Sequence, residues 1–455
     1  MLLGNKAREE FKITPITTDE MTALIEKCGE VYAGRPFWRD YDDIRTVNFA
    51  KSICSETSRL ATLAIGVEVE GSPRAEMLNE KLQDVVAVLR HWVEYGCAYG
   101  TIIMKPCADG VQMILPSDFI ITATENETIT GIVFEDHAVS ADGKTFYSRL
   151  EYHRIEDGRY YISNRCYAGS SENDVTKRVS IDETPWVGMM EEAESDDVDK
   201  MLFGIFRTPT ANNIDVFSPL GLPLFYDCLE ELKDLDVAYS RNSTEILDSR
   251  RTVLLDSDRL LVGGGKVVNT ADGFERARER LRLPDYVRAV HGDGVNTMYE
   301  EINPTLNTET RLQGINALLS QIGYKCGYSN GHFVFNEKNG IATATQVEAE
   351  QQRTIQMVKD VRDAIQTCVD GLLYALDVMA DINGDPTGTY EVTYDFGDIT
   401  YNYEEDKARW YSYVTAGQIP FWYYLTKFEG MTEDEARKLA EMAQPEEPTL
   451  FGGEE

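Results

Sequence analysis

A short segment, GYSNG at 327–331, matches the G-x-S-x-G pattern that surrounds the nucleophilic serine of many hydrolases. In those enzymes the serine lies between a strand and a helix, and a histidine elsewhere in the chain accepts its proton. Here a helical pattern precedes Ser329, a strand-like run follows it, and the only later histidine is His332. A serine hydrolase using Ser329 is therefore the alternative function, and a flexible turn is the favoured interpretation.

No other segment carries a complete catalytic motif. The sequence VGGGK at 262–266 resembles part of a P-loop, but Leu260 and Val267 stand where that loop needs a glycine and a Ser or Thr. The five histidines are far apart, and none is at helical ligand spacing from another His or Cys. We therefore predict no ATP hydrolysis, no cofactor and no enzymatic activity.

Two carboxylates in YDFGD, Asp395 and Asp398, are a candidate pair for a cation. Paired acids near the end of a strand are more often a solvated turn, so no metal site is predicted here. Whether a cation binds at this pair is left open by the sequence.

A cluster of alternating arginines interrupts an otherwise acidic chain. On a strand the four side chains would share one face, and on a helix they would spread around it. Either arrangement suits contact with DNA or with an acidic partner, and a solvated face balanced by Glu275 and Glu279 is the plainer interpretation. The four residues are Arg276, Arg278, Arg280 and Arg282.

Composition excludes several classes of protein. The net charge of −34 argues against a protein that grips nucleic acid, because such a grip relies on Lys and Arg neutralising phosphates. It suits an ordinary acidic cytosolic protein, or a surface that DNA passes without sticking. No run approaches the ~18 apolar residues of a membrane span, and the start lacks an apolar signal core. The eight scattered cysteines indicate reduced, mostly buried thiols.

The first half of the chain alternates between helical and strand patterns. Helices are predicted over 17–34, 42–66 and 78–100 from the three- and four-residue spacing of apolar side chains. Four strands follow between 100 and 137, and then a hairpin over 145–167 with its turn at Asp157–Gly158. The acidic segment 189–201 is predicted to be a mobile loop.

The second half is dominated by long helices. One is predicted over 218–251, a second over 307–327, and a third from Thr345 to Met379, which would span ~50 Å. A capping box marks the start of the third helix, and Gly371 would permit a kink. After it come strand-like residues, an aromatic segment, and a final helix that begins with a capping box of Thr432 and Glu435.

The order of these parts and the sequences of four segments resemble the portal proteins of tailed bacteriophages, in particular the Gram-positive siphophage type. NFAKSICSETSRLA is similar to part of that family's N-terminal wing. NNIDVFSPLGLPLFYDCLEELKDLDVAYSR is similar to the entry into the first stem helix. GYSNGHFVFNEKNGIATATQVEAEQQRT is similar to the link into the long wing helix, and AGQIPFWYYLTKFEGMTEDEARKLAEM to the C-terminal helical pair.

The resemblance implies an α+β fold with a portal-type architecture and a long kinked wing helix. The implied parts, in chain order, are an N-terminal wing (1–217), a first stem helix (218–251), a small α/β clip (252–306), a second stem helix (307–325), a tunnel-loop region (326–343), the long wing helix (344–381) and a C-terminal wing and short crown region (382–455).

The resemblance also implies a function. Twelve copies would form a ring at one capsid vertex, assembled in the bacterial cytoplasm and retained in the virion without membrane contact. The terminase large subunit would package double-stranded DNA through the ring without sequence specificity. Head-completion adaptors, the major capsid protein and scaffolding proteins would be further partners. The DNA would later be ejected through the same ring. A monomeric scaffold protein is another alternative, distinguished by its mass in solution.

Three sets of site residues follow from the resemblance. The clip arginines would meet the packaging motor and the adaptors. The apolar stripe of the long helix would pack between subunits through Val358, Val361, Ile365 and Leu372. The DNA-facing candidates of the tunnel loop are Asn330, Gly331, His332, Phe333, Asn336, Glu337, Lys338 and Asn339.

Overall fold

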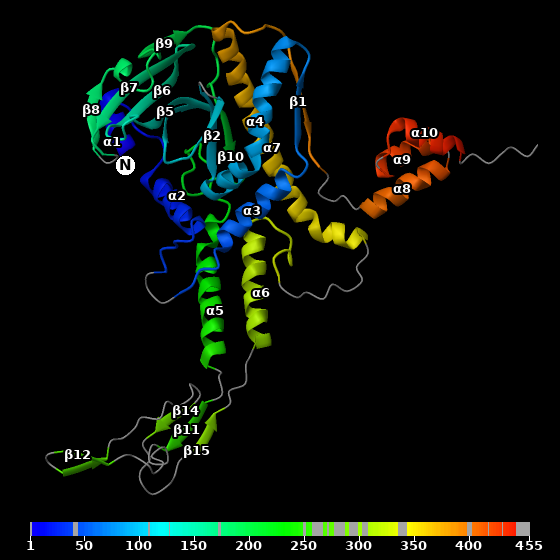
Figure 1. Cartoon of the computed structure of the whole chain (residues 1–455). Coiled ribbons are helices and arrows are strands. Elements are labelled where there is room, and N and C mark those ends of the chain that lie inside the picture. Colours follow the sequence, from blue (N-terminus) through cyan, green and yellow to red (C-terminus); the bar gives the residue numbers. More distant parts are fainter. Residues whose placement is uncertain are drawn as a thin grey trace, which may run out of the picture. The chain divides into compact units, whose positions relative to one another are not determined.

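The computed structural model divides the chain into two compact units, residues 1–395 and 396–455, and its mixture of helices and antiparallel sheets confirms the α+β class (Figure 1). The structure describes residues 2–39, 44–107, 110–126, 128–171, 174–248, 252–256, 267–270, 273–276, 287–290, 299–302, 308–334, 344–397, 403–416, 418–429 and 431–442.

The largest sheet of the first unit is antiparallel and has the strand order β4-β5-β6-β7-β8, with β9 added on β7. The Asp157–Gly158 turn between β6 and β7 is confirmed: both residues have positive φ, 51° and 78°, as a type I′ hairpin turn requires. The strands are β4 Phe119–Glu125, β5 Thr128–Val139, β6 Phe146–Glu156, β7 Arg159–Gly169, β8 Val175–Val179 and β9 Glu192–Ser195.

Strand β9 corrects one expectation. It lies within 189–201, which its acidic composition had predicted to be a mobile loop, yet Glu192 to Ser195 pair with β7. Glu192 also accepts hydrogen bonds from Ser163 and Arg165 of that strand. Arg165 on the neighbouring strand therefore compensates the charge of Glu192, a contact that the sequence pattern alone does not reveal.

A second, three-stranded sheet and the first two helices, α1 and α2, pack against the largest sheet. This sheet has the order β10-β2-β3, all antiparallel. One apolar core joins the two sheets to α2 and α7, with Met21, Ile103, Phe134 and Phe203 among its buried members. The elements are α1 Leu2–Phe11, α2 Asp19–Tyr32, α3 Phe49–Ala61, α4 Pro73–Tyr99, β2 Thr101–Cys107, β3 Gly110–Ile114, the 3₁₀ turn η1 Ile181–Glu183 and β10 Gly204–Arg207.

Helix α4 begins five residues before the predicted 78–100 helix. Its N-cap is Ser72, whose hydroxyl accepts a hydrogen bond from the Ala75 N–H, and Pro73 occupies the first helical position. Proline suits that position because the missing N–H would have no partner inside the helix. The helix ends at Gly100, which has φ 79° and approaches the backbone of Gly221 so closely that a Cβ would lie 2.2 Å from its carbonyl oxygen.

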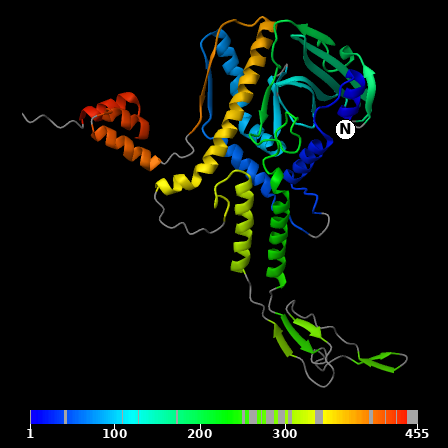
Figure 2. The ribbon, with the colours of Figure 1, turned by 180° about the vertical axis from the view of Figure 1, so that it is seen from behind.

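The long helix is confirmed and is longer than predicted. Helix α7 spans Ala344–Asn383, 40 residues, and begins one residue before the predicted start at Thr345. Figures 1 and 2 show that it bends in its N-terminal, yellow part. Gly371 has another role. Its missing side chain lets the helix approach β10, since a Cβ there would lie 3.0 Å from the Phe203 carbonyl oxygen.

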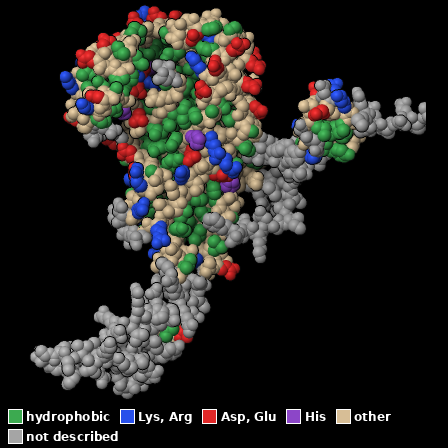
Figure 3. All heavy atoms as spheres, viewed as in Figure 1, with side chains coloured by type: hydrophobic (Ala, Val, Ile, Leu, Met, Phe, Trp, Pro, Cys, Tyr) green, Lys and Arg blue, Asp and Glu red, His purple; other side chains and the backbone are tan. Residues whose placement is uncertain are grey.

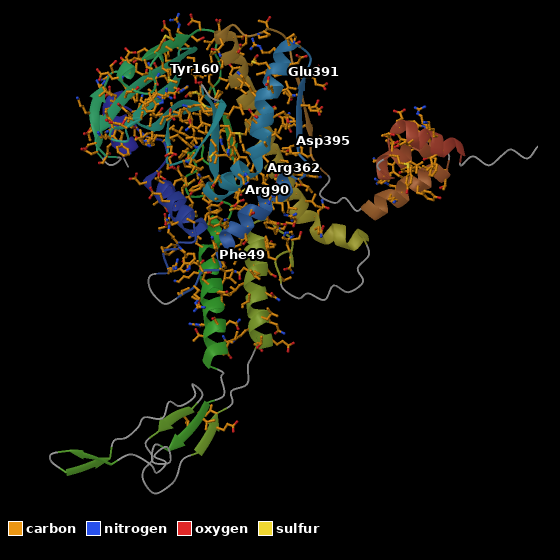
Figure 4. All side chains as sticks on the ribbon, in the orientation of Figure 1. Phe49, Arg90, Tyr160, Arg362, Glu391 and Asp395 are labelled. Carbon is orange, nitrogen blue, oxygen red and sulfur yellow. The ribbon has the colours of Figure 1, made fainter. Side chains whose placement is uncertain are left out.

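Two arginines fix α7 to helices from the first hundred residues. The Arg362 guanidinium donates from Nε to the carbonyl oxygen of Ala61, 3.1 Å away at the end of α3 (Figure 4). Arg74, 1% exposed, lies at the start of α4 and bonds to Asp377, Asp381 and the Pro386 carbonyl oxygen. A cation at a helix C-terminus is favourable because the free carbonyl groups carry partial negative charge.

The chain that follows α7 returns to the first unit. Strand β16 Glu391–Asp395 pairs antiparallel with β1 Gly66–Glu70, and Gly66 is opposite Asp395. This pairing places the start of the predicted C-terminal region, 382–395, with the N-terminal elements. The remainder belongs to the second unit.

Helices α5 Leu229–Asp248 and α6 Thr308–Lys325 form an antiparallel pair (Figures 1 and 2). Ion pairs join them near both ends: Lys325 Nζ lies 2.7 Å from Glu231 Oε1, and Arg311 contacts Glu245. The first stem helix was predicted over 218–251, but only the 3₁₀ turn η2 Tyr226–Cys228 precedes α5. Pro219 and Pro223 explain the later start, because proline lacks an N–H and disfavours helix in the residue before it.

The segment between α5 and α6 is inserted at the end of this pair. Its described residues are all strand, without a helix among them, so the α/β composition predicted for 252–306 is not seen in that part. A three-stranded sheet has the order β14-β11-β15, and β12 pairs with β13. The strands are β11 Thr252–Asp256, β12 Val267–Thr270, β13 Gly273–Arg276, β14 Val287–Val290 and β15 Tyr299–Ile302.

The second unit is helical. Helices α8 Tyr403–Thr415, α9 Phe421–Glu429 and α10 Glu433–Met442 surround a small core of Tyr424, Leu425, Phe428 and Ala436. The predicted capping box at α10 is confirmed, since Glu435 Oε2 accepts hydrogen bonds from both the N–H and the hydroxyl of Thr432. Among the described helices, none is both long enough and apolar enough to cross a membrane.

Candidate functional site

The turn that follows α6, residues 326–334, contains half of the DNA-facing candidates and is held firmly to α3 and α7. We call it the anchored turn. Tyr328 of this turn is completely buried, and its hydroxyl lies 2.6 Å from Thr57 Oγ1 of α3. Burial raises the pKa of Tyr328, which keeps the phenol protonated as a hydrogen-bonding group. The turn is therefore fixed from inside the fold rather than by its exposed face.

Ser329 is also buried, which bears on the hydrolase motif. Its N–H donates to Thr354 Oγ1 at 2.8 Å, and its hydroxyl lies 3.1 Å from the same oxygen, on α7. Helix α6 precedes it, and the strand-like run HFVF is turn or irregular backbone as far as Val334. The strand–serine–helix geometry that exposes a nucleophile is thus not formed around Ser329.

The other candidates of the anchored turn lie at its surface. Asn330 is exposed and Gly331 adopts φ 85°. His332 points its Nε2 to Glu56 at 3.4 Å, and the Phe333 ring packs edge-on against Phe49 at 5.2 Å between centroids. Four predicted positions lie outside the described residues: Asn336, Glu337, Lys338 and Asn339.

The arginine cluster is described at one position. Arg276 ends β13, opposite Val267 of β12. That hairpin places Arg276 on a strand, where alternate residues share a face. Arg278, Arg280 and Arg282 lie outside the described residues, as does Asp398 of the candidate cation pair. Asp395 is the last residue of β16. Groups of three or more His, Cys, Asp or Glu that could hold a metal ion do not occur among the described residues.

The predicted intersubunit stripe of the long helix needs a correction. Val358, Val361, Ile365 and Leu372 are at most 1% exposed within the single chain. They pack against the chain's own helices and sheets, so they cannot be the side chains that meet a neighbouring subunit in this conformation. The length of α7 is instead explained by the elements it crosses, which are α3, α4, β2 and β10.

A buried network of charges, which the sequence did not reveal, lies between β2 and the large sheet. We call its members, Lys105, Asp136, Arg149, Glu151 and His153, the ion network. Arg149 Nη2 lies 2.5 Å from Asp136 Oδ2 and 2.9 Å from Glu151 Oε2, and Lys105 also contacts Glu151. Side-chain exposures are 13% or less.

The cations and carboxylates of the ion network are equal in number, and its hydrogen bonds extend to a tyrosine. Two cations face two carboxylates, and His153 joins Glu151 at 2.9 Å to the hydroxyl of Tyr160 at 2.7 Å. Figure 4 shows Tyr160 within the sheet. Burial acts to raise the pKa of Glu151, but Lys105, His153 and Arg149 together lower it well below its usual value. The alternation of Arg149, Glu151 and His153 along β6 was a sequence signal, but such a pattern ordinarily marks a solvent-facing side.

A pocket of about 480 Å³ with a mixed polar and apolar lining lies between α4, the β2–β3 hairpin and the C-terminal part of α7. Val88 and Trp92 of α4, Val111 of β3 and Met379 of α7 are among its lining residues. Figure 3 shows that apolar side chains interrupt the charged surface of this unit on the face it presents. The lining offers contact with an apolar group and brings together no catalytic set.

Similarity to known proteins was found among solved structures. No protein-family model matches the chain, and no curated protein matches it. Among solved structures, one similar chain comes from the virion of a native gene transfer agent particle. It has 12% sequence identity and a TM-score of 0.41, and the alignment covers 94% of this chain and 99% of that one.

Proposed function

We propose that this chain is the portal subunit of a tailed bacteriophage, which forms a ring-shaped DNA channel at one capsid vertex. The observation that carries the proposal is the order of three elements. The antiparallel α5–α6 pair holds a strand-rich insertion between its helices, and the 40-residue α7 then crosses the α/β part of the chain. This order matches the stem, clip and long wing helix that the sequence resemblance implies.

The anchored turn supports a channel-lining role for the residues beyond it. Tyr328 and Ser329 tie the chain after α6 to α3 and α7, and the segment 335–343 follows them in sequence before α7 begins. We propose that Asn336 to Asn339 face the DNA and that the aromatic anchors before them do not.

Charge supports passage of DNA rather than a grip on it. A net charge of −34 repels phosphate, and this repulsion would let a duplex slide in a channel. In this proposal the terminase large subunit and the head-completion adaptors dock on the clip, where the arginines 276 to 282 offer complementary charge. Capsid and scaffolding proteins contact the outside of the ring.

Assembly is the first test. Native mass spectrometry of the purified chain should give a closed oligomer, twelve subunits in the capsid-derived form, and end-on electron micrographs should show a central channel. A protein that stays monomeric at all accessible concentrations, with unchanged folding, would favour the scaffold alternative.

The DNA-facing segment allows a sharper test. Deleting Asn336 to Asn339 leaves Tyr328 and Phe333 in place, so rings and heads should assemble while DNA packaging or retention falls. The matched control replaces the exposed Asn330 by Ser within the anchored turn. Virions of normal genome content from the deletion would remove the assignment of this segment.

A further inference from the structure

Two buried cysteines meet where the α5–α6 pair joins the rest of the first unit. Cys228 ends η2 and Cys326 follows α6, and their Sγ atoms lie 3.6 Å apart although 98 positions separate them in sequence. The two residues are 1% and 2% exposed. Since bonded sulfur atoms are ~2.05 Å apart, a disulfide would need an approach of only about 1.5 Å.

Neighbouring contacts hold the two sulfur atoms in register. Lys325, next to Cys326, donates to the Asp227 carbonyl oxygen at 2.7 Å and contacts Glu231 Oε1 at 2.7 Å. Cys228 Sγ also lies 3.8 Å from the Ile322 carbonyl oxygen. The end of α6 and the start of α5 are thus tied by polar contacts on both sides of the sulfur pair.

We propose that Cys228 and Cys326 form a latent disulfide site, reduced in the cytoplasm during assembly and oxidised once the particle is outside the cell. The timing rests on the proposed function, whereas the chemistry rests on the sulfur geometry alone. The bond would join the two helices covalently at their base and enclose the whole insertion between them.

The oxidant we name is a hydroperoxide. The thiolate of one cysteine attacks an oxygen of hydrogen peroxide, the O–O bond breaks, and water leaves with the protons to give a sulfenic acid. The sulfur of the second cysteine then displaces the sulfenic oxygen as a second water, and the S–S bond forms. Two thiols are oxidised by two electrons, and one peroxide is reduced to two waters.

The surroundings make this reaction slow, which suits a protein that must assemble first. The hydrogen bond with Cys228, together with burial, raises the pKa of the Cys326 thiol well above its usual value, so little thiolate is present at neutral pH. Cys107 is the only exposed cysteine of the eight, all of which the structure describes, and it should react first.

The test uses the full chain with Cys107→Ser, which removes the exposed thiol. After reduction and then prolonged exposure to hydrogen peroxide, free thiols are alkylated and peptides are mapped without reductant. We expect a linked peptide pair containing Cys228 and Cys326, and a rise in Tm of about 2–5 °C that a reductant reverses. Cys228→Ser in the same background should lose both, and Cys368→Ser, in the middle of α7, should keep both.

The outcomes separate this inference from the proposed function. A linked pair in a protein that never forms rings would keep the disulfide site and remove its link to a virion. Rings without the linked pair would overturn the disulfide site alone. A link from Cys28 to Cys228 would also overturn it, because Cys228 would then pair with a different cysteine. Peptide mapping of the Cys107→Ser protein distinguishes these outcomes even if the added Cys228→Ser variant fails to fold.

Discussion

At the scale of single residues, Glu151 is a buried carboxylate whose charge is compensated by neighbouring side chains. Its carboxylate lies beside Lys105, Arg149 and His153, and all four side chains are at most 13% exposed. A buried ion pair adds little stability over an apolar pair, but removing one partner is costly because an uncompensated charge stays behind. We therefore expect the ion network to specify how β2 meets the large sheet more than it stabilises that contact.

Replacing Glu151 by Gln leaves two cations facing the single carboxylate of Asp136. We expect the free energy of unfolding at neutral pH to fall by about 3 kcal/mol. Urea denaturation checks this, with Glu156→Gln on the same strand as the control. Glu156 is 61% exposed and pairs with Arg154 at the surface, so its loss should cost at most about 1 kcal/mol.

The same variant predicts a pH dependence. Because folding lowers the pKa of Glu151, its stabilisation is present above the unfolded value of about 4.3 and is lost as pH falls through the folded pKa. The stability difference between wild type and Glu151→Gln should therefore narrow below about pH 4. A difference that stays constant from pH 7 to pH 3 would show that Glu151 does not act through its charge.

A second residue-scale prediction concerns the anchored turn. Tyr328→Phe removes the hydroxyl that meets Thr57 Oγ1 at 2.6 Å inside the fold. We expect a loss of about 1 kcal/mol in the free energy of unfolding, the usual net value of a buried hydrogen bond. Tyr324→Phe is the control, since that residue is 58% exposed and should change stability by less than about 0.5 kcal/mol. Equal effects for the two variants would contradict the anchoring role of Tyr328.

At the scale of elements, α7 is organised by glycines as much as by its apolar stripe. A Cβ on Gly204 of β10 would lie 2.0 Å from the Cys368 carbonyl oxygen, and Gly371 meets the same strand from the helix side. Helix and strand therefore approach backbone to backbone. Because of this close contact, the apolar side chains of α7 are buried by other elements of the same chain.

Gly204→Ala should push α7 away from β10 and lower the free energy of unfolding by about 3 kcal/mol. Gly314→Ala is its counterpart in α6, where nothing lies within 4 Å of the added Cβ. That variant should be neutral or more stable by up to about 1 kcal/mol, because alanine is the better helix former. Thermal unfolding of both proteins measures the contrast, and a Gly204→Ala protein as stable as wild type would refute the close approach.

At the scale of the whole molecule, the chain forms two units that differ in how they are stabilised. The first closes through pairing of distant segments, such as β1 with β16 and Arg74 with the residues after α7. The second has its own small aromatic core. Removal of the second unit should therefore leave the first intact.

A truncation after Asp395 should keep the main unfolding transition within about 2 °C of the full chain, because it cuts at the boundary between the two units. A truncation after Asn383 removes β16 and leaves β1 as an unpaired edge, and it should unfold at a clearly lower temperature. Circular dichroism measures both. If the first truncation aggregates or melts early, the two units are not independent.

Local patterns in the sequence determined the elements whose signals are short-range. The Asp157–Gly158 hairpin, the capping box at Thr432 and the period of α7 were read correctly, because turn chemistry and helical spacing act between neighbours in the chain. Only the tertiary structure decided which side chains are buried and by what. It placed Val358 in the core of the chain, Glu151 beside Lys105, and Cys228 against Cys326. Each of these depends on segments dozens to hundreds of residues apart, and no local periodicity specifies which distant segment completes a contact.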